Sequence, residues 1–273
     1  MAELGWTGPA RDHAVMTEDA AAAAGGGPGA AAKGASARSG RLGHPDGGRA
    51  AVEPRHDGAG PSEWAVPGQV GVGPWPGGRD AWPRDERYDP ELLEHGDARN
   101  VADAYRYWRR EAVAADLAGR AHPFHVAIEN FGHDYNIGTV VRTANAFAAA
   151  GVHIVGRRRW NRRGAMVTDR YLQVHHHETL SGLVEFAAAH GLAVVAVDNT
   201  PGAHRLETAD LPRHCVLLFG QEGPGVTDEA HAAATMTVSI AQFGSTRSIN
   251  AGVAAGIAMH AWIRQHADLP GAW

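Results

Sequence analysis

The sequence has a single cysteine, Cys215, among its 273 residues. One cysteine cannot form an internal disulfide, which excludes a disulfide-stapled scaffold and fits a reducing compartment. We therefore expect a cytoplasmic protein in which Cys215, within the apolar run CVLLFG, is a buried core thiol. No apolar run approaches the roughly 18 residues of a membrane-spanning helix. The first fifteen residues lack a basic start and an apolar stretch, so we expect no secretion signal.

An excess of positive charge is also missing. The chain has 25 Lys and Arg against 30 Asp and Glu, and its formal net charge is −5. This balance excludes a polycationic protein that binds nucleic acid through its overall charge. Any nucleic-acid binding must come from a local patch.

The first part of the chain has few aliphatic residues at helical or strand spacing. Residues 1 to 85 are mostly Ala, Gly, Pro and scattered charge, so they cannot bury enough apolar surface to offset their ordering entropy. We predict a disordered tail, in which Trp64, Trp75 and Trp82 could still dock onto a folded body. Residues 86 to 122 are predicted to form a helical extension, with Asn100 capping a helix over residues 101 to 120. Its aromatic and arginine residues (Tyr105, Tyr107, Trp108, Arg109 and Arg110) are expected to pack rather than to bind RNA.

From residue 123 to residue 268, short apolar runs alternate with helical patterns. We expect strands in the runs FHVAIEN, VHIVG, LAVVAVD, CVLLFG and VSI, and helices between them, the first ending at Gly151 and the second at Gly191. This alternation is typical of an α/β domain whose parallel sheet is covered by helices on both faces. Ligands of such sheets gather at the carboxyl ends of the strands. Three loops are expected there, at residues 129 to 138, 198 to 202 and 220 to 225.

The stretch from Thr237 to Ala267 contains a short strand, a turn at Gly244 and a long helix rich in small residues. Gly252 and Gly256 lie inside that helix, where each glycine costs about 1 kcal/mol relative to alanine. Close approach of another backbone or of a ligand is the usual reason for such glycines. Ser248, Ile249 and Asn250 precede the helix, where free N–H groups bind ligand oxygens. The alternative is an ordinary N-capped helix.

Two other stretches carry polar groups at the expected ligand edge. The run GQEGPG, residues 220 to 225, predicts a tight turn that lets backbone approach a ligand, with Glu222 as its lone carboxylate. It lacks both the G-K-S/T ending of a phosphate loop and the spacing of a dinucleotide fingerprint. Asn136 precedes a mostly apolar helix that contains Arg142, and helical periodicity keeps Arg142 off the core face. Arg142 could point into a cleft, but a lone arginine near a helix start is usually a surface charge.

In their order and spacing, the three stretches resemble the three motifs of the SpoU (TrmH-like) branch of the SPOUT RNA methyltransferases. The matching positions are Asn136, Gly138 and Arg142 in the first motif; Phe219, Gly220, Glu222, Gly223 and Gly225 in the second; and Ile240, Gly244, Ser248, Ile249 and Asn250 in the third. The resemblance covers residues 124 to 266. The chain departs from the family at Ala241, where proline is frequent, and at Ile249, where leucine is commoner. Neither departure removes a reactive group.

The resemblance implies a SPOUT methyltransferase domain over residues 123 to 268, with a deep trefoil knot in its C-terminal part. It implies S-adenosylmethionine as the cofactor and a homodimer in which each active site is completed across the interface. The reaction would be methyl transfer to a ribose 2′-hydroxyl of tRNA or rRNA. By position, the cofactor-binding residues would be Asn199, Thr200, Gly220, Ile240 and Ile249. The catalytic residues would be Arg142, Asn136, Glu222, Ser248 and Asn250.

Proposals for the family make the first-motif arginine, here Arg142, the group that removes the proton of the 2′-hydroxyl. Because a guanidinium has a pKa above about 12, a neutral arginine is costly near neutral pH. Our hypothesis is that Arg142 binds the adjacent phosphate and stabilises the developing alkoxide. The other four catalytic residues would orient Arg142, the ribose and the cofactor.

The run RRRWNRR is the local basic patch that RNA binding requires. Its guanidinium groups suit phosphates and its indole suits an unstacked base, so we predict RNA contacts for Arg157, Arg158, Arg159, Trp160, Arg162 and Arg163. A solvated charged face is the alternative. His175, His176 and His177 are adjacent, so on a strand they point to alternate faces, and no partner has metal-ligand spacing; we assign no metal.

Two other functions are alternatives to an RNA methyltransferase. A non-catalytic RNA-binding dimer would keep the fold without turnover, but every reactive position of the motifs is filled. A nucleotide-dependent oxidoreductase would need a glycine fingerprint after the first strand, and IENFGHDYNIG does not supply one.

Overall fold

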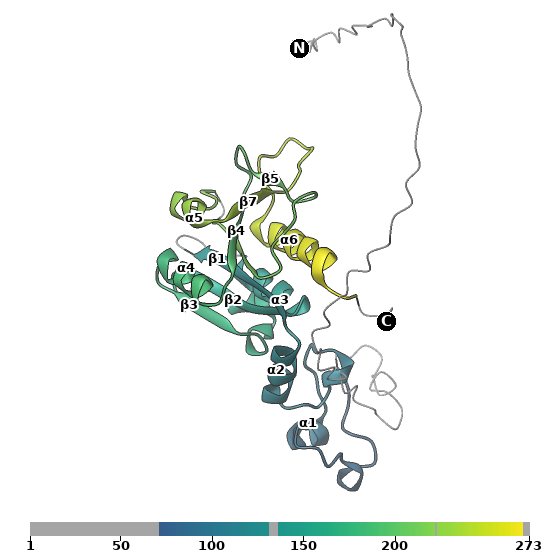
Figure 1. Ribbon diagram of the computed structural model, residues 1–273. Helices are drawn as coiled ribbons and strands as arrows, with labels where there is room; N and C mark the ends of the chain where they lie inside the picture. The colour runs from purple at the N-terminus through teal and green to yellow at the C-terminus, as the bar shows by residue number, and fades with distance from the viewer. Residues whose placement is uncertain (1–70, 131–135, 222, 270–273) are drawn as a thin grey trace, which may run out of the picture. The chain divides into compact units, whose positions relative to one another are not determined.

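Seven parallel strands form one sheet in the computed structural model, which describes residues 71 to 130, 136 to 221 and 223 to 269 (Figure 1). The order across the sheet is β3-β2-β1-β6-β4-β7-β5, and every neighbouring pair is parallel. The strands are β1 (His122–Asn130), β2 (Ala149–Gly156), β3 (Val174–His177), β4 (Ala193–Val197), β5 (His204–Arg205), β6 (Cys215–Phe219) and β7 (Met236–Ser239). The predicted parallel α/β sheet is confirmed, although β3 and β5 were not among the predicted strands.

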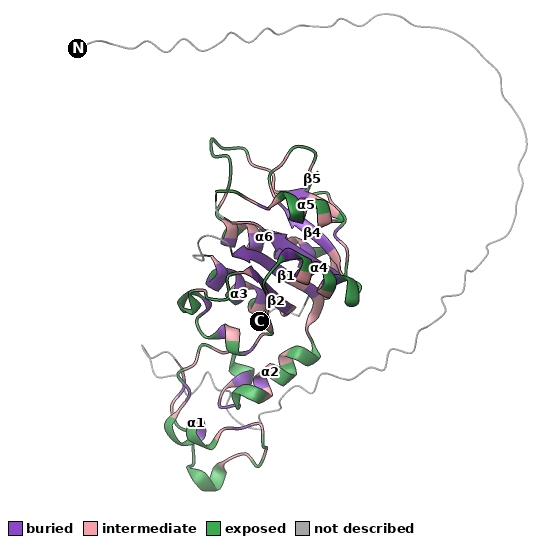
Figure 2. Cartoon of the chain, turned by 90° about the vertical axis from the view of Figure 1, so that its left-hand side faces the viewer, coloured by how far each residue is buried: buried purple, intermediate pink, exposed green. Residues whose placement is uncertain are grey.

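Helices cover both faces of the sheet. α3 (Ile137–Ala146) and α6 (Ala251–His266) pack on one face, where they share a core with Phe124, Val126 and Leu217. α4 (Leu180–Ala189) and α5 (Asp228–Ala233) pack on the other. In Figure 2 the central strands are buried between these layers, while the outer sides of the helices are exposed. The continuous apolar runs of β4 and β6 follow from this arrangement, because a strand covered on both faces has no solvent side.

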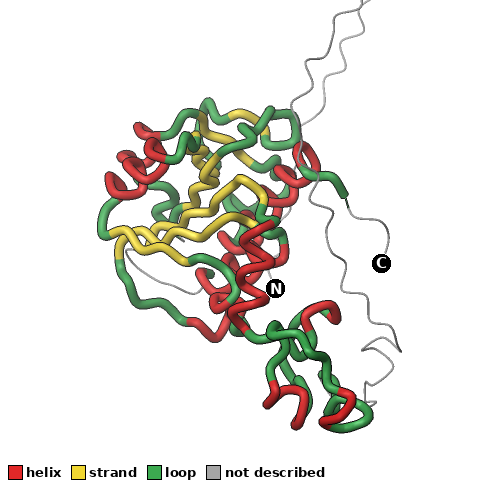
Figure 3. The backbone as a smooth tube through the Cα atoms, turned by 60° about the horizontal axis from the view of Figure 1, so that its bottom comes forward, coloured by secondary structure: helices red, strands yellow, loops and turns green. Residues whose placement is uncertain are grey.

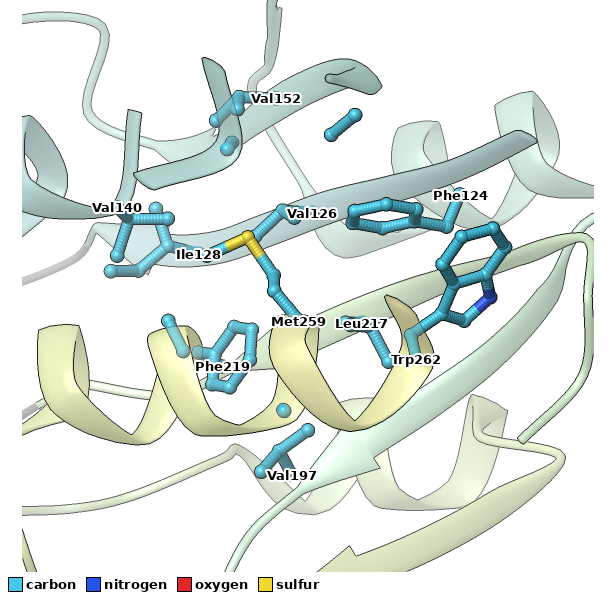
Figure 4. Packing of buried hydrophobic residues seen from close by; sticks show 14 of the residues in the cluster. Phe124, Val126, Ile128, Val140, Val152, Val197, Leu217, Phe219, Met259 and Trp262 are labelled. Carbon is cyan, nitrogen blue, oxygen red and sulfur yellow. The ribbon is translucent and has the colours of Figure 1, made fainter. Parts of the chain in front are cut away.

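The larger core lies under α6. Met259 and Trp262 point from that helix toward Phe124 of β1 and Leu217 of β6, and all four side chains are fully buried (Figure 4). The rings of Trp262 and Phe124 lie 4.5 Å apart between centroids. The indole Nε1 donates to the carbonyl of Pro212 at 3.2 Å, which satisfies the polar end of the buried ring. Cys215 is buried in the same cluster, as predicted, and burial raises the pKa of its thiol to about 12.

The opposite face of β1, β2 and β3 carries a cluster of histidines. His153 Nε2 lies 3.0 Å from His125 Nδ1, and His153 Nδ1 lies 2.8 Å from His177 Nε2, so three strands are bridged by imidazoles. The ring of His175 stacks on His153 with centroids 4.8 Å apart. Burial, followed by the neighbouring histidines, lowers the pKa of His125 to about 4 and that of His153 to about 2. From the sequence, only His175, His176 and His177 were singled out, and only as possible metal ligands.

A third hydrophobic cluster is formed by residues 71 to 120 together with Tyr171. This part contains α1 (Pro90–His95) and α2 (Arg110–Gly119), and loops account for more of residues 71 to 109 than helices do (Figure 3). Tyr105, Tyr107 and Trp108 are buried in the cluster, which confirms that they pack. The carboxylate of Asp97 is fully buried and accepts hydrogen bonds from the backbone N–H groups of Arg99, at 3.0 Å, and Tyr107, at 2.9 Å.

The structure corrects three of the predicted boundaries. The helix expected from residue 101 begins only at Arg110, because Tyr107 has a φ of 62° and interrupts the helical path. α3 ends at Ala146, and Gly151 lies inside β2. Ordered structure precedes residue 85, since Trp75 and Trp82 pack against the cluster of residues 71 to 120. Trp64 and the rest of the predicted tail before residue 71 lie outside the described residues. Within the part of the chain that is described, no helix is long and apolar enough to cross a membrane.

Candidate functional site

A cleft of about 870 Å³ lies at the carboxyl ends of β4, β6 and β7. These strands are neighbours in the sheet although long stretches of chain separate them. Their following loops therefore meet, as expected for a parallel sheet. The cleft is lined by all five residues predicted to bind a cofactor, Asn199, Thr200, Gly220, Ile240 and Ile249, and by Ser248 and Asn250.

The loop after β6 is a tight turn, as its glycines predicted. The backbone groups of Gln221 and Gly225 exchange two hydrogen bonds of 3.1 Å. A side chain on Gly220 would place its Cβ 2.0 Å from the backbone carbonyl carbon of Gly225. Gly225 itself has a φ of 78°, which favours glycine. The predicted catalytic residue Glu222 lies outside the described residues.

Asp198, directly after β4, ties two of the loops together. Its carboxylate accepts hydrogen bonds from the backbone N–H of Asn199, at 2.8 Å, and from that of Val226, at 3.2 Å. His231 Nε2 lies 3.1 Å from the same carboxylate. Sequence reasoning missed Asp198, although an aspartate that directly follows a buried strand was a usable signal.

Asparagine side chains attach the third stretch to the loop after β4 and to the first stretch. Asn199 Nδ2 donates to the carbonyl of Arg247 at 3.0 Å. Asn250 Oδ1 caps α6 by accepting from the N–H groups of Gly252 and Val253, so the N-capped helix is confirmed. Asn250 Nδ2 also donates to Asn136 Oδ1 at 2.9 Å. The predicted catalytic residues Asn136 and Asn250 therefore hold the first motif against the third.

Close packing between α3 and α6 accounts for one of the two helical glycines. A Cβ on Gly252 would lie 3.1 Å from the Cγ2 methyl of Thr139, which is tighter than ordinary contact. A Cβ on Gly256 would lie 3.8 Å from the same atom of Thr143, which is ordinary contact distance. At Gly252 the close neighbour is a threonine side chain of α3 rather than the predicted backbone or ligand, and at Gly256 no close approach requires a glycine.

Arg142 lies on the outward side of α3 and is exposed, as helical periodicity predicted. Its neighbours Val141 and Ala144 are buried in the core. Arg142 is not one of the described residues that line the cleft of this single chain. All five predicted cofactor-binding residues therefore line the cleft, together with the predicted catalytic residues Ser248 and Asn250. Asn136 is hydrogen-bonded to Asn250, while Arg142 does not line the cleft.

The end of β1 anchors the loops on either side of it. The buried carboxylate of Glu129 accepts hydrogen bonds from Thr227, at 3.0 Å from the backbone N–H and 2.6 Å from the hydroxyl. Asn130 Nδ2 donates to the carbonyls of Arg157, at 2.7 Å, and Arg159, at 3.2 Å. One strand end therefore orders both the segment after the glycine loop and the arginine-rich segment.

The arginine-rich segment, residues 157 to 163, packs beside the start of α3. A Cβ on Gly138 would lie 2.7 Å from the Cα of Gly164, so two glycines allow the backbones to meet there. The five arginines of the segment are exposed. Trp160 is half-buried against the main core, and the Arg162 guanidinium lies 5.5 Å from its ring centroid. Packing against the core therefore leaves less of the Trp160 indole ring available to stack on an RNA base than the sequence predicted.

Two further residues of the third stretch line the cleft and were not singled out from the sequence. Arg247 is one of them, and its backbone carbonyl accepts the hydrogen bond from Asn199. Gln242 has a buried side-chain oxygen that accepts no hydrogen bond from any residue within the described ranges. A buried acceptor without a donor is costly, so this oxygen is suited to an N–H or O–H group of a ligand.

Comparison with known proteins identifies what the chain is similar to. Residues 123 to 260 match the model described as the SpoU rRNA Methylase family. The tRNA (guanosine(18)-2′-O)-methyltransferase of Escherichia coli is 29% identical over 160 residues, which cover 58% of this chain and 70% of that enzyme. An uncharacterized tRNA/rRNA methyltransferase of Mycolicibacterium smegmatis is 32% identical, over 57% of this chain and 51% of that protein. The TrmH/SpoU tRNA modifying enzyme of A. aeolicus shares the fold, with a TM-score of 0.51 and 22% identity over 57% of this chain and 82% of that one.

Proposed function

This chain belongs to the SpoU rRNA methylase family, and we propose that it transfers a methyl group from S-adenosylmethionine to a ribose 2′-hydroxyl of tRNA or rRNA. One observation carries the proposal: the five residues predicted to bind the cofactor surround a single cleft. The E. coli relative, whose name specifies a tRNA guanosine 2′-O-methyltransferase, supports the same reaction class. The RNA and the nucleotide that this chain modifies are separate questions.

The residues of the cleft fit the cofactor. Its volume of about 870 Å³ falls within the usual range of small-molecule sites, about 300 to 1,000 Å³. Ile240 and Ile249 supply apolar surface, and the glycine loop lines the cleft. The buried side-chain oxygen of Gln242 can accept a hydrogen bond from an amino group of the cofactor. When bound, S-adenosylmethionine supplies an electrophilic methyl group.

The chain's own residues have to bind the acceptor ribose and assist the loss of the proton from its 2′-hydroxyl. Arg142 is proposed to bind the adjacent phosphate and to stabilise the negative charge that develops on the 2′-oxygen. Asn136 and Asn250 join α3 to α6 at 2.9 Å and so position the helix that carries Arg142. Ser248, which lines the cleft, and Glu222 are proposed to orient the ribose and the cofactor. Arg157 to Arg163 are proposed to hold the RNA backbone.

We extend the proposal to a homodimer whose active sites are completed across the interface. The exposed position of Arg142, outside the cleft lining of its own chain, supports this arrangement. Val253 and Ile257 are exposed apolar residues on α6, the helix that packs against α3, and they offer a surface for a second copy. The trefoil knot and the cytoplasmic location are proposed from the family and the RNA substrate.

Methyl transfer from labelled S-adenosylmethionine to separate pools of unmodified tRNA and rRNA tests the proposal. We expect label in one pool, at one position that resists alkaline cleavage because its 2′-oxygen is methylated. If alkali released the label in single nucleotides, the 2′-hydroxyl would be free and the methyl group would be on a base. Absence of label from both pools and from assembled ribosomal particles, with cofactor binding intact, would favour the non-catalytic RNA-binding dimer.

Gly220→Ala is expected to weaken S-adenosylmethionine binding by about 5- to 150-fold, since overpacking typically costs about 1–3 kcal/mol. The added Cβ would collide with the backbone of Gly225 at 2.0 Å, so the loop cannot keep its shape. Gly119→Ala, at the end of α2, is the matched control, because nothing lies within 4 Å of a Cβ at that position. Isothermal titration calorimetry of both variants measures the difference. Equal affinities would show that the glycine loop does not shape the cofactor site.

A further inference from the structure

We propose that Phe243 is a stacking platform for an unpaired nucleobase at the rim of the cleft, and that Arg247 holds a neighbouring phosphate. This inference rests on the proposed function, since it assigns a binding site to the RNA substrate of the same cleft. Phe243 and Arg247 lie in the segment between β7 and α6.

The segment that presents Phe243 is anchored at both ends. The backbone N–H of Ala241 donates to Glu207 Oε1 at 2.9 Å. At the other end, the carbonyl of Arg247 accepts the hydrogen bond from Asn199 Nδ2 at 3.0 Å. Phe243 lies between these anchors, next to Gln242. Because Gln242 and Arg247 both line the cleft, the backbone of Phe243 lies at its rim, and the side chain is exposed there.

The exposure of Phe243 is unusual for this molecule. Its relative accessibility is 97%, whereas Phe124 and Phe219 are at 0% and 1%. Among the described residues, no other aromatic side chain is classed as exposed. Single exposed apolar residues are common on proteins. The position of this one, at the mouth of a cleft and four residues from a cleft-lining arginine, is what makes it informative.

The reaction brings a nucleobase to this rim. The acceptor 2′-hydroxyl has to reach into the cleft, and its base is attached to C1′, the carbon next to C2′. A base taken out of its stack needs a replacement surface, which aromatic side chains provide in RNA-binding proteins. Arg247, four residues along the same segment, has the guanidinium that suits the phosphate that follows every ribose.

A protein partner is the less favoured occupant. The exposed part of the segment, residues 243 to 248, contains no large apolar residue besides Phe243. A protein interface needs a wider apolar centre than one ring. One ring flanked by glycine, serine, threonine and arginine instead suits a flat aromatic ligand with an anionic backbone.

The test compares a single-stranded oligoribonucleotide with an oligomer of the same length whose sugars lack bases, with both bound to the full chain without cofactor. The wild-type chain should bind the base-containing probe more tightly. Phe243→Ala should remove most of this difference, a loss of roughly ten-fold, and should leave binding of the abasic probe unchanged. Phe243→Trp should retain the difference. Arg247→Ala should weaken both probes and reduce the salt dependence of binding by about one phosphate contact.

Leu269→Ala is the matched control, because Leu269 is an exposed apolar residue outside the cleft lining, at 73% accessibility. Unchanged affinity of Phe243→Ala for the base-containing probe would overturn the inference. A changed oligomeric state by light scattering would assign Phe243 to a contact between copies, and a weakened affinity for S-adenosylmethionine alone would assign it to the cofactor; either result also overturns it. Because these assays need no turnover, they fail or succeed independently of methyl transfer by the wild-type chain.

Discussion

Arg142→Ala is expected to lower kcat for methyl transfer by about 100- to 1,000-fold, the usual cost of removing a group that stabilises a developing oxyanion. The fold should be unaffected, because Arg142 is exposed on α3. Cofactor affinity should also be unaffected, because the residue does not line the cleft of its own chain. Single-turnover rates at saturating RNA and cofactor measure the effect.

Arg142→Lys separates charge from geometry. Lysine keeps a positive charge but loses the planar fork that binds a phosphate through two parallel hydrogen bonds. We therefore expect Arg142→Lys to remain impaired, and the rate of the wild-type chain to show no dependence on a group that titrates between pH 6 and 7. Full activity of Arg142→Lys, together with such a titration, would assign proton removal to a different residue.

Mixing two inactive variants tests whether Arg142 acts across the dimer. Arg142→Ala lacks the arginine and Gly220→Ala binds the cofactor weakly. At a cofactor concentration above the Kd of the wild-type loop but well below that of Gly220→Ala, neither homodimer should show more than a small fraction of wild-type activity. In a mixed dimer, one of the two composite sites would receive an intact loop from one protomer and Arg142 from the other. After random exchange of protomers, about a quarter of wild-type activity should return. No recovery, with exchange confirmed by tagged protomers, would place the whole site within one chain.

Acidification from pH 7.5 to pH 5 is expected to reduce the free energy of unfolding by about 3 kcal/mol through the histidine cluster. Burial, then the adjacent histidines, lowers the pKa of His153 to about 2 and that of His125 to about 4, below the ordinary value of 6.5. Between these values and 6.5 the unfolded chain binds more protons than the folded one, so stability is fully present above pH 6.5 and falls as the pH falls. At pH 5, which is 1.5 pH units below the ordinary histidine pKa, each histidine that stays neutral in the folded chain lowers the free energy of unfolding by about 2 kcal/mol, since one pKa unit is about 1.4 kcal/mol. His125 is partly exposed, and solvent screening reduces its share to about 1 kcal/mol.

Urea unfolding at pH 7.5 and pH 5 measures this loss. His153→Phe keeps a ring against Phe186, which lies 4.6 Å from His153 between centroids, but removes the titrating group. This variant should lose about two thirds of the pH dependence. His204→Gln is the matched control, because His204 is exposed on β5 and its replacement leaves the cluster intact. Equal stability of the wild-type chain at both pH values would contradict the assignment.

The sequence by itself determined five of the seven strands and the three functional stretches. Apolar runs such as those of β4 and β6 can only be buried strands, and the glycines of residues 220 to 225 can only make a tight turn, because these are local constraints. Positions 199, 200, 220, 240 and 249 were identified by resemblance, and the structure places all five around one cleft.

The tertiary structure decided how these parts meet. The order of the strands, in which β4 lies between β6 and β7, depends on long-range pairing that no local pattern encodes. That order places Asp198 against Val226, and helix packing places Asn250 against Asn136. It also aligns His125, His153 and His177 on one face, although they come from three separate strands. The same packing directs Arg142 outward, a result that helical periodicity anticipated only as far as its absence from the core.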